Sequence, residues 1–321
     1  MKAFRRKILV VALLSPAIAV ATPLVVATDT LLPGEFSISS SFEYTHANYV
    51  SQYVENQGEF FISDSTGNSY AGTGRISVAA GLTDTLRAGV SLPYLMFQTS
   101  ESHVTFGSQF ADYQWDFSGA KDVSVTLNHL LFHGYGRIAI GGTLWIPTGD
   151  DTPSYARVIE NGSVLTSNGS IGGAGHGRYD GQLDIHWSGE GARIAPLFSM
   201  HYLHRGSRTK NGVNYDYGDT VELNVGGLLN PSSLWTIHSA LTAGYHATEQ
   251  IGGTRYYPFP FGSYLVEAFA KLSPSLYLNA RLMQHREFYQ GYDKVLANGS
   301  ATRTYSRDVT TSFRVGMEFN W

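Results

Sequence analysis

The last residues of the chain alternate between two kinds of side chain. Every second position from Phe313 to Trp321 is apolar, and the positions between them hold Arg314, Gly316, Glu318 and Asn320. Because successive side chains of a strand point to opposite faces, this alternation predicts a strand with one apolar face and one hydrated face.

The same two-residue period recurs about twelve times along the chain. Each stretch covers roughly ten residues, the length that a tilted strand needs to cross a bilayer. The expected strands are 36–44, 76–82, 86–94, 123–131, 138–146, 179–187, 194–202, 221–229, 235–245, 264–272, 276–282 and 313–321. This pattern predicts an all-β fold, a transmembrane antiparallel β-barrel. The alternative is a β-sandwich, which would not place an aromatic-capped apolar face on every strand.

Short and long connections alternate between these stretches. The short ones are rich in Gly, Pro, Ser and Asn, as in Thr83-Asp84-Thr85 and Ser273-Pro274-Ser275. The long ones are polar and are expected to be loops: 47–70, 98–119, 148–177, 206–218, 249–260 and 288–305. Barrels of the outer membrane have short periplasmic turns and long extracellular loops, so both termini are expected on the periplasmic side. Pro93 is expected to mark the outer end of the third strand.

The N-terminal segment has the features of an export signal. A basic start at Lys2, Arg5, Arg6 and Lys7 precedes a short apolar run from Ile8 to Leu14, and Ala19-Val20-Ala21 resembles a cleavage site. We therefore expect a cleaved signal peptide at 1–21, a periplasmic segment at 22–34 and an outer-membrane barrel at 35–321.

Composition supports this class of protein. Charged residues make up only 15% of the chain, against roughly 25% in soluble domains. The signal holds four of the 22 basic residues and none of the 26 acidic ones, so the mature chain carries 18 basic and 26 acidic residues, a net charge of −8. With no basic patch, nucleic acid is not an expected partner. The absence of cysteine excludes disulfides and thiolate metal sites.

The polar face of the strands gives the candidate functional residues. Ionisable side chains of both signs are expected to line a watery interior, because unpaired charges in a dry interior are costly. The candidate pore lining is Arg75, Arg87, Asp122, Arg137, Asp180, Asp184, His186, His201, Glu222, His238, Glu267, Lys271, Arg281, His285, Arg314 and Glu318, with Glu35 and Glu43 on the same face.

Three functions remain open at this point. The first is a channel for small molecules, and the second is a structural or surface-interaction barrel whose lumen is plugged by its own side chains. The third is an outer-membrane lipid hydrolase using Ser199 and His201, although alternation alone often produces such pairs. No catalytic residue, cofactor or metal is predicted. Asp150-Asp151 and Gly218-Asp219 resemble calcium-binding turns but fit ordinary turn chemistry.

Several short motifs mark turns and strand ends between residues 75 and 230. They are Gly81–Leu86, Gly89–Tyr94, Gly119–Val123, Pro147–Asp150 and Gly175–Asp180. Together they resemble the outer-membrane transporter family called "MetA-pathway of phenol degradation", which is distantly similar to fatty-acid and aromatic-hydrocarbon channels. Lys121 departs from the family's pattern, which has Gly before this Asp.

The resemblance implies passive uptake of small hydrophobic or aromatic compounds, and it transfers no substrate residues. The expected partners are outer-membrane lipid and lipopolysaccharide, a small-molecule solute, and the barrel-assembly machinery, whose recognition signal the strand Phe313–Trp321 resembles. The longest loop, 148–177, is expected to be a mobile lid or an inward-folded constriction.

Overall fold

The structure is a computed structural model that describes residues 31–56, 60–106, 109–134, 136–149, 155–160, 163–166, 174–191, 193–210, 212–251, 254–256, 258–288, 290–295 and 301–321. Its regular elements are all strands, joined in one antiparallel sheet. Among the described residues, no helix has the length and apolarity needed to cross a membrane. The predicted signal peptide at 1–21 and most of the 22–34 segment lie outside the described residues, so both stay predictions.

The strand segments join into twelve barrel strands in the described part of the chain. Three long strands come first: β1 (Phe36–Asn56), β2 (Phe60–Gly81) and β3 (Leu86–Phe106). Eight more are each broken once, into β4 (Gln109–Ala120) and β5 (Val123–His133), β6 (Gly136–Ile146) and β7 (Tyr155–Glu160), β8 (Ser163–Thr166) and β9 (Asp180–Gly189), β10 (Ile194–Arg205) and β11 (Arg208–Lys210), β12 (Val213–Asp216) and β13 (Thr220–Leu229), β14 (Trp235–His246) and β15 (Glu249–Ile251), β16 (Thr254–Tyr256) and β17 (Phe259–Lys271), and β18 (Leu276–Glu287) and β19 (Gln290–Val295). The last is β20 (Ala301–Asn320).

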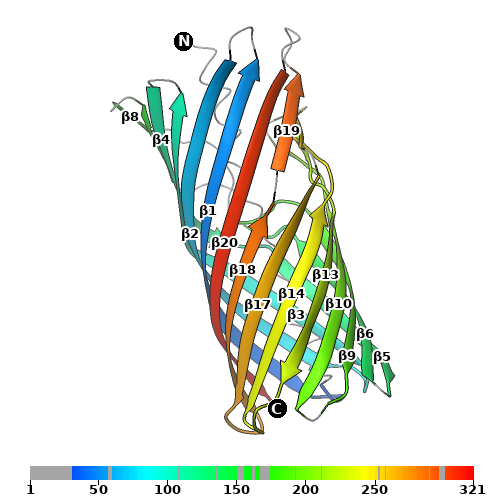
Figure 1. Ribbon diagram of the computed structural model, residues 1–321. Coiled ribbons are helices and arrows are strands. Elements are labelled where there is room, and N and C mark those ends of the chain that lie inside the picture. The colour runs from blue at the N-terminus through cyan, green and yellow to red at the C-terminus, as the bar shows by residue number, and fades with distance from the viewer. Residues whose placement is uncertain are drawn as a thin grey trace.

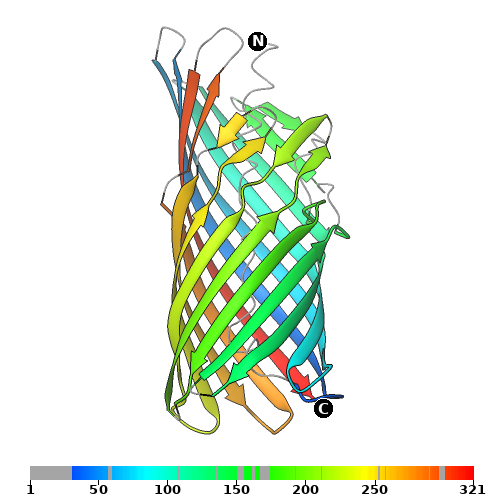
Figure 2. The same cartoon turned by 90° about the vertical axis from the view of Figure 1, so that its right-hand side faces the viewer.

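The first and last strands close the barrel. β1 and β20 pair along nearly their whole length, from Ser37 opposite Asn320 to Glu55 opposite Thr302. At the end of this seam, Phe36 and Trp321 exchange two backbone hydrogen bonds of 3.0 Å each. Figure 2 shows the tilted strands forming one continuous wall. Along the part of the wall that carries the apolar face, closure leaves no unpaired strand edge, as a barrel in lipid requires. Among the described segments beyond that part, β8 pairs only with β7 and β11 only with β12.

The outer and inner faces of the wall have opposite character. In β10 every second residue from Ile194 is exposed and the residues between them are buried. The exposed residues at the end of β20 are Phe313, Val315, Met317 and Phe319, and Trp321 directly after it continues the set; all are about half exposed. Large apolar side chains therefore cover the outside, while the buried residues of the same strands point into the barrel. The predicted transmembrane β-barrel of about twelve strands is confirmed.

Tight turns gather at one end of the barrel, which we call the turn end. The turns after β2 and β17 have the same design, because the hydroxyls of Thr83 and Ser273 accept hydrogen bonds from the N–H groups two residues later, of Thr85 and Ser275. Figure 1 shows these turns beside the C-terminus, opposite the end where β1, β2 and β20 project. The predicted tight turns thus alternate with the longer polar segments, as the sequence indicates, and we call the opposite end the loop end.

The long connections are not the loops that the sequence suggested. Most of 47–70 and 98–119 continues as strand, so that β1 to β3 reach 21 or 22 residues. β7, β8, β11, β12, β15, β16 and β19 likewise extend the wall. The expectation of strands near ten residues was wrong because only the membrane-facing part of each strand carries an apolar face. Beyond that part the backbone keeps pairing without a regular apolar outer face, and in the extension of β3 and β4 the buried side chains include Tyr113 and Trp115.

The strand from Leu86 also runs past its predicted end. Pro93 lies inside β3, where its partner strand changes from β5 to β4, and its carbonyl accepts a hydrogen bond from the N–H of Lys121 (3.0 Å). The hydrogen-bond ladder is interrupted where the partner strand changes. Because no strand N–H is needed at that point, a proline, which has none, is tolerated there. A register shift follows between Leu95 and Gln98, and the neighbouring Met96 and Phe97 are both exposed.

Candidate channel lumen

Strand register brings the predicted lumen residues of β9, β10 and β13 to one height. His201 of β10 lies opposite Asp184 of β9 on one side and Glu222 of β13 on the other. One step toward the turn end, Ser199 lies between His186 and Asn224 in the same way. Residues that are distant in sequence thus form two adjacent rows of inward polar groups.

A chain of hydrogen bonds runs along these two rows. His201 bonds through Nδ1 to Asp184 Oδ1 (2.5 Å) and through Nε2 to Ser199 Oγ (2.9 Å). The amide of Asn224 donates to Ser199 Oγ (3.0 Å), and the hydroxyl of Thr242 donates to Asn224 Oδ1. Asp184, His201 and Ser199 are buried, Ser199 with no exposed surface.

This chain has the order of a serine hydrolase triad but not its surroundings. Ser199 lies inside the barrel, away from lipid, and already receives a hydrogen bond from Asn224. β10 pairs with β9 and β13, so the backbone N–H groups near Ser199 donate to neighbouring strands. They are therefore not available to stabilise an oxyanion. The arrangement is therefore a buried polar network, not an accessible nucleophile.

A second cluster of charges lies between β17, β18, β20 and β1. Arg281 pairs with Glu43 at 2.8 Å and Arg314 with Glu267 at 2.7 Å. All four side chains are nearly inaccessible to solvent. Closer to the turn end, Arg87 donates to Ser37 Oγ (3.2 Å) and lies 3.9 Å from Glu318. In the structure these charges are therefore arranged in pairs of opposite sign.

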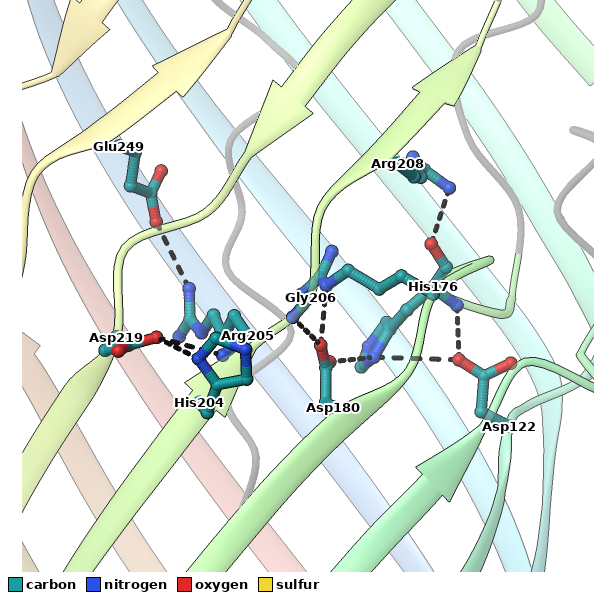
Figure 3. A network of polar contacts seen from close by, with 10 residues as sticks. Asp122, His176, Asp180, His204, Arg205, Gly206, Arg208, Asp219 and Glu249 are labelled. Atoms are coloured by element: carbon teal, nitrogen blue, oxygen red, sulfur yellow. Dashed lines mark hydrogen bonds and ion pairs between the residues drawn. The ribbon is translucent and has the colours of Figure 1, made fainter.

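A third network lies where the strands are broken, and Figure 3 shows it from close by. Asp122, between β4 and β5, accepts hydrogen bonds from the backbone N–H groups of Gly149 (2.9 Å) and His176 (2.7 Å). Asp180 accepts from Gly206 N–H (3.0 Å) and from Arg178 Nε (2.7 Å). Each break frees backbone donors from the ladder, and these carboxylates satisfy them.

The same network continues around the wall toward β15. Arg205, the last residue of β10, bonds to Glu249 at 3.2 Å, and Asp219 accepts from the N–H of Arg205 (3.2 Å). Burial raises the pKa of the Glu249 carboxyl, although the Arg205 guanidinium lowers it. On the outer side, His204 Nδ1 and Tyr202 Oη both contact Asp219, at 2.9 and 2.5 Å. A belt of polar contacts thus supports the loop end of the barrel.

Asp308 lies above the apolar part of β20, whose outward residues begin at Phe313. One of its carboxylate oxygens, Oδ1, is buried without a hydrogen-bond partner. Burial, and then the negative charge of Glu287, raise the pKa of Asp308 to about 8.

The structure places the sixteen candidate lumen residues in three environments. One is exposed: Lys271 ends β17 at the turn end, where its ammonium lies 5.5 Å from the centre of the Tyr277 ring, outside the packed interior. Arg75, Arg137, Glu222 and Glu318 are half-buried. The remaining eleven are buried: Arg87, Asp122, Asp180, Asp184, His186, His201, His238, Glu267, Arg281, His285 and Arg314. Glu43 is buried as well, and Glu35 binds the N–H of Leu32 (2.8 Å). Their role as a pore lining stays a prediction.

Sequence reasoning missed several residues of the third network. Arg205 lies on the same face of β10 as Ser199 and His201, four residues after His201. Continuing the two-residue alternation to the end of this strand would therefore have identified it. His176 and Arg178 lie in the motif Gly175–Asp180, which was interpreted only as a turn. Glu249 and Glu287 lie at or beyond the ends of the predicted strands, so no alternation of apolar and polar residues marked them as inward side chains.

Part of the predicted lid can be placed. β7 pairs with β4, and β8 pairs with β7, so these segments of 148–177 continue the wall. The parts 150–154, 161–162 and 167–173 lie outside the described residues, so the lid or constriction stays a hypothesis.

No protein-family model matches the chain, and no curated protein matches its sequence. The resemblance to the phenol-degradation family therefore rests on the short motifs alone. Among solved structures, the chain is similar to the COG4313 outer membrane channel from Pseudomonas putida F1, with a TM-score of 0.52, 14% identity and coverage of 90% of this chain and 97% of that one. A Pseudomonas aeruginosa FadL homologue follows, with a TM-score of 0.49, 9% identity and coverage of 88% and 90%. At this identity the first likeness shows the fold, which is that of an outer-membrane β-barrel.

Proposed function

We propose that this chain is an outer-membrane channel for passive uptake of small solutes, with hydrophobic or aromatic compounds as the favoured class. The observation that carries the proposal is the contrast between the two faces of one closed wall. Apolar side chains such as Val225 (61% exposed) and Leu241 (69%) cover the outside, while ionisable groups fill the inside. Outer-membrane channels have this architecture, an apolar exterior around a polar interior.

An aromatic cluster in the lumen supports the solute class. The ring centre of His246 lies 4.7 Å from those of Phe259 and Phe261, and Phe261 lies 4.9 Å from His285. All four side chains are buried inside the barrel and lie between the charged cluster and the loop end. Aromatic rings stack favourably with one another, so a flat solute that parts these packed rings gains contacts that a sugar does not.

The solute class is testable by liposome swelling with sugars and aromatic acids of matched size. We expect faster swelling with aromatic acids, and Phe261→Ser should reduce that preference. Phe198→Ser is the matched control, because Phe198 is 39% exposed on the outside. The absence of swelling with every solute would favour the plugged barrel. Lipid hydrolysis that Ser199→Ala abolishes would favour the hydrolase.

Membrane insertion is part of the same proposal. Trp321 directly follows β20 and continues its outward residues, and its ring stacks with Phe36 at 6.1 Å between centroids. We propose that lipid and lipopolysaccharide contact this apolar surface and that assembly machinery recognises Phe313–Trp321. Deleting Trp321 should reduce the amount of folded barrel in outer-membrane fractions, whereas unchanged amounts would contradict this recognition.

A further inference from the structure

We propose that the barrel interior contains a binding site for a divalent transition-metal ion, formed by Asp184, His186 and His201. Their ligand atoms all lie within 4.8 Å of one another. Asp184 and His186 are two residues apart on β9, so they share the inward face, and His201 lies opposite Asp184 on β10. Metal binding at these residues is independent of whether solutes pass through the barrel.

The donor set selects the class of ion. Two imidazole nitrogens and one carboxylate oxygen suit Zn²⁺, Co²⁺, Ni²⁺ and Cu²⁺, whereas Mg²⁺ and Ca²⁺ prefer oxygen ligands. Three protein ligands leave a further position open toward the lumen. Glu222 lies opposite His201 on β13, so a second carboxyl group stands beside the site.

His186 gives independent support for a ligand. Its side chain is 3% exposed, and its Nδ1 atom is buried without any hydrogen-bond partner. Its ring lies 5.3 Å from that of His201, in an edge-on arrangement. A buried nitrogen without a partner loses its hydration without compensation, and a metal ion would provide the missing contact.

The neighbours of His201 are suited to hold it as a ligand. With its proton on Nε2, His201 donates to Ser199 Oγ (2.9 Å), and the lone pair of Nδ1, which Gln182 Nε2 approaches at 3.4 Å, can bind an ion. Ser199 Oγ has two lone pairs and can accept from both His201 and Asn224. Gln182 donates to Asp184 Oδ1 (2.5 Å), which orients the carboxylate.

Binding requires a small rearrangement. Ligand atoms around a tetrahedral ion are about 3.4 Å apart, since each lies about 2.1 Å from the metal. The contact of 2.5 Å between His201 Nδ1 and Asp184 Oδ1 must therefore open, and the ion takes the place of the proton between these atoms.

The test uses the full mature chain without a polyhistidine tag, treated with EDTA and kept in detergent. Zn²⁺ is titrated by calorimetry and Co²⁺ by visible absorption. We expect one strongly bound ion per chain, and at least tenfold weaker binding in His186→Ala and in His201→Ala. Ser199→Ala keeps every ligand and should still weaken binding about tenfold.

His238→Gln is the matched control, because His238 is also a buried inward histidine but lies on β14, outside the cluster. It should bind as the wild type does. Circular dichroism and heat-dependent mobility on gels show whether each variant is folded, and Ser199→Ala carries the test if a histidine variant fails to fold. Lack of strong binding by the wild type, or equal binding by wild type, His201→Ala and Ser199→Ala, would overturn the proposal.

Discussion

Arg281 and Arg314 lie directly opposite each other on β18 and β20, and each guanidinium pairs with a carboxylate beyond the other. Arg281 reaches past β20 to Glu43, and Arg314 reaches past β18 to Glu267. Like charges directly opposite each other on a sheet destabilise it. The two crossed ion pairs offset that repulsion and join four strands across the seam where the barrel closes.

The crossed pairs predict a strong coupling between Arg281 and Glu43. Arg281→Met alone leaves Glu43 buried without its partner and should cost about 3–5 kcal/mol of unfolding free energy. The double variant Glu43→Gln/Arg281→Met should lose clearly less than the sum of the single losses, as measured by denaturant unfolding in detergent. Lys271→Met, at an exposed position, should change little. Additive losses would contradict the coupling.

The base of the longest loop depends on Asp122. Asp122→Asn has only one acceptor oxygen for the two N–H groups of Gly149 and His176, so one of these contacts is lost. We expect trypsin to cleave faster within 148–177 while the barrel remains folded. Glu190→Gln, in an exposed turn at the other end, is the control. Equal cleavage rates for the wild type and Asp122→Asn would show that Asp122 does not hold the loop.

Asp308 predicts a pH dependence of stability. Its pKa is raised to about 8 in the folded chain, so the folded state binds one more proton than the unfolded state between about pH 4 and 8. The stabilising contribution is complete below the unfolded pKa and is lost as pH rises through the folded value. Wild type should therefore lose about 1–3 kcal/mol more than Asp308→Asn between pH 5 and 9.

Unfolding at a series of pH values measures this difference. Asp84→Asn, in an exposed turn, should follow the wild type. An Asp308→Asn variant with the full pH dependence of the wild type would rule out this role for Asp308.

The sequence predicts the wall of the barrel better than its interior. Lipid contact imposes the two-residue period, so sets such as Phe313, Val315 and Met317 reveal each strand and its face. Above the bilayer this constraint ends, and the extensions of β1 to β3 could not be distinguished from loops. The shift near Leu95 was hidden as well, because a bulge leaves no compositional mark.

Interior pairs depend on geometry that a sequence does not contain. Glu43 and Arg281 are 238 positions apart and meet only because β1 and β20 close the barrel. Alternation did place Asp184, His186 and His201 on the inward face. Their convergence follows from the register of β9 with β10, which turn lengths and bulges determine together.

Single-channel recording in planar bilayers tests most directly whether the polar interior is a passage. We predict discrete conductance steps for the wild type and larger steps for Glu43→Ala/Arg281→Ala, which shortens two side chains without leaving a buried charge unpaired. Phe198→Ala, on the outer face, should conduct as the wild type does. Absence of conductance in both the wild type and the double variant would contradict the channel.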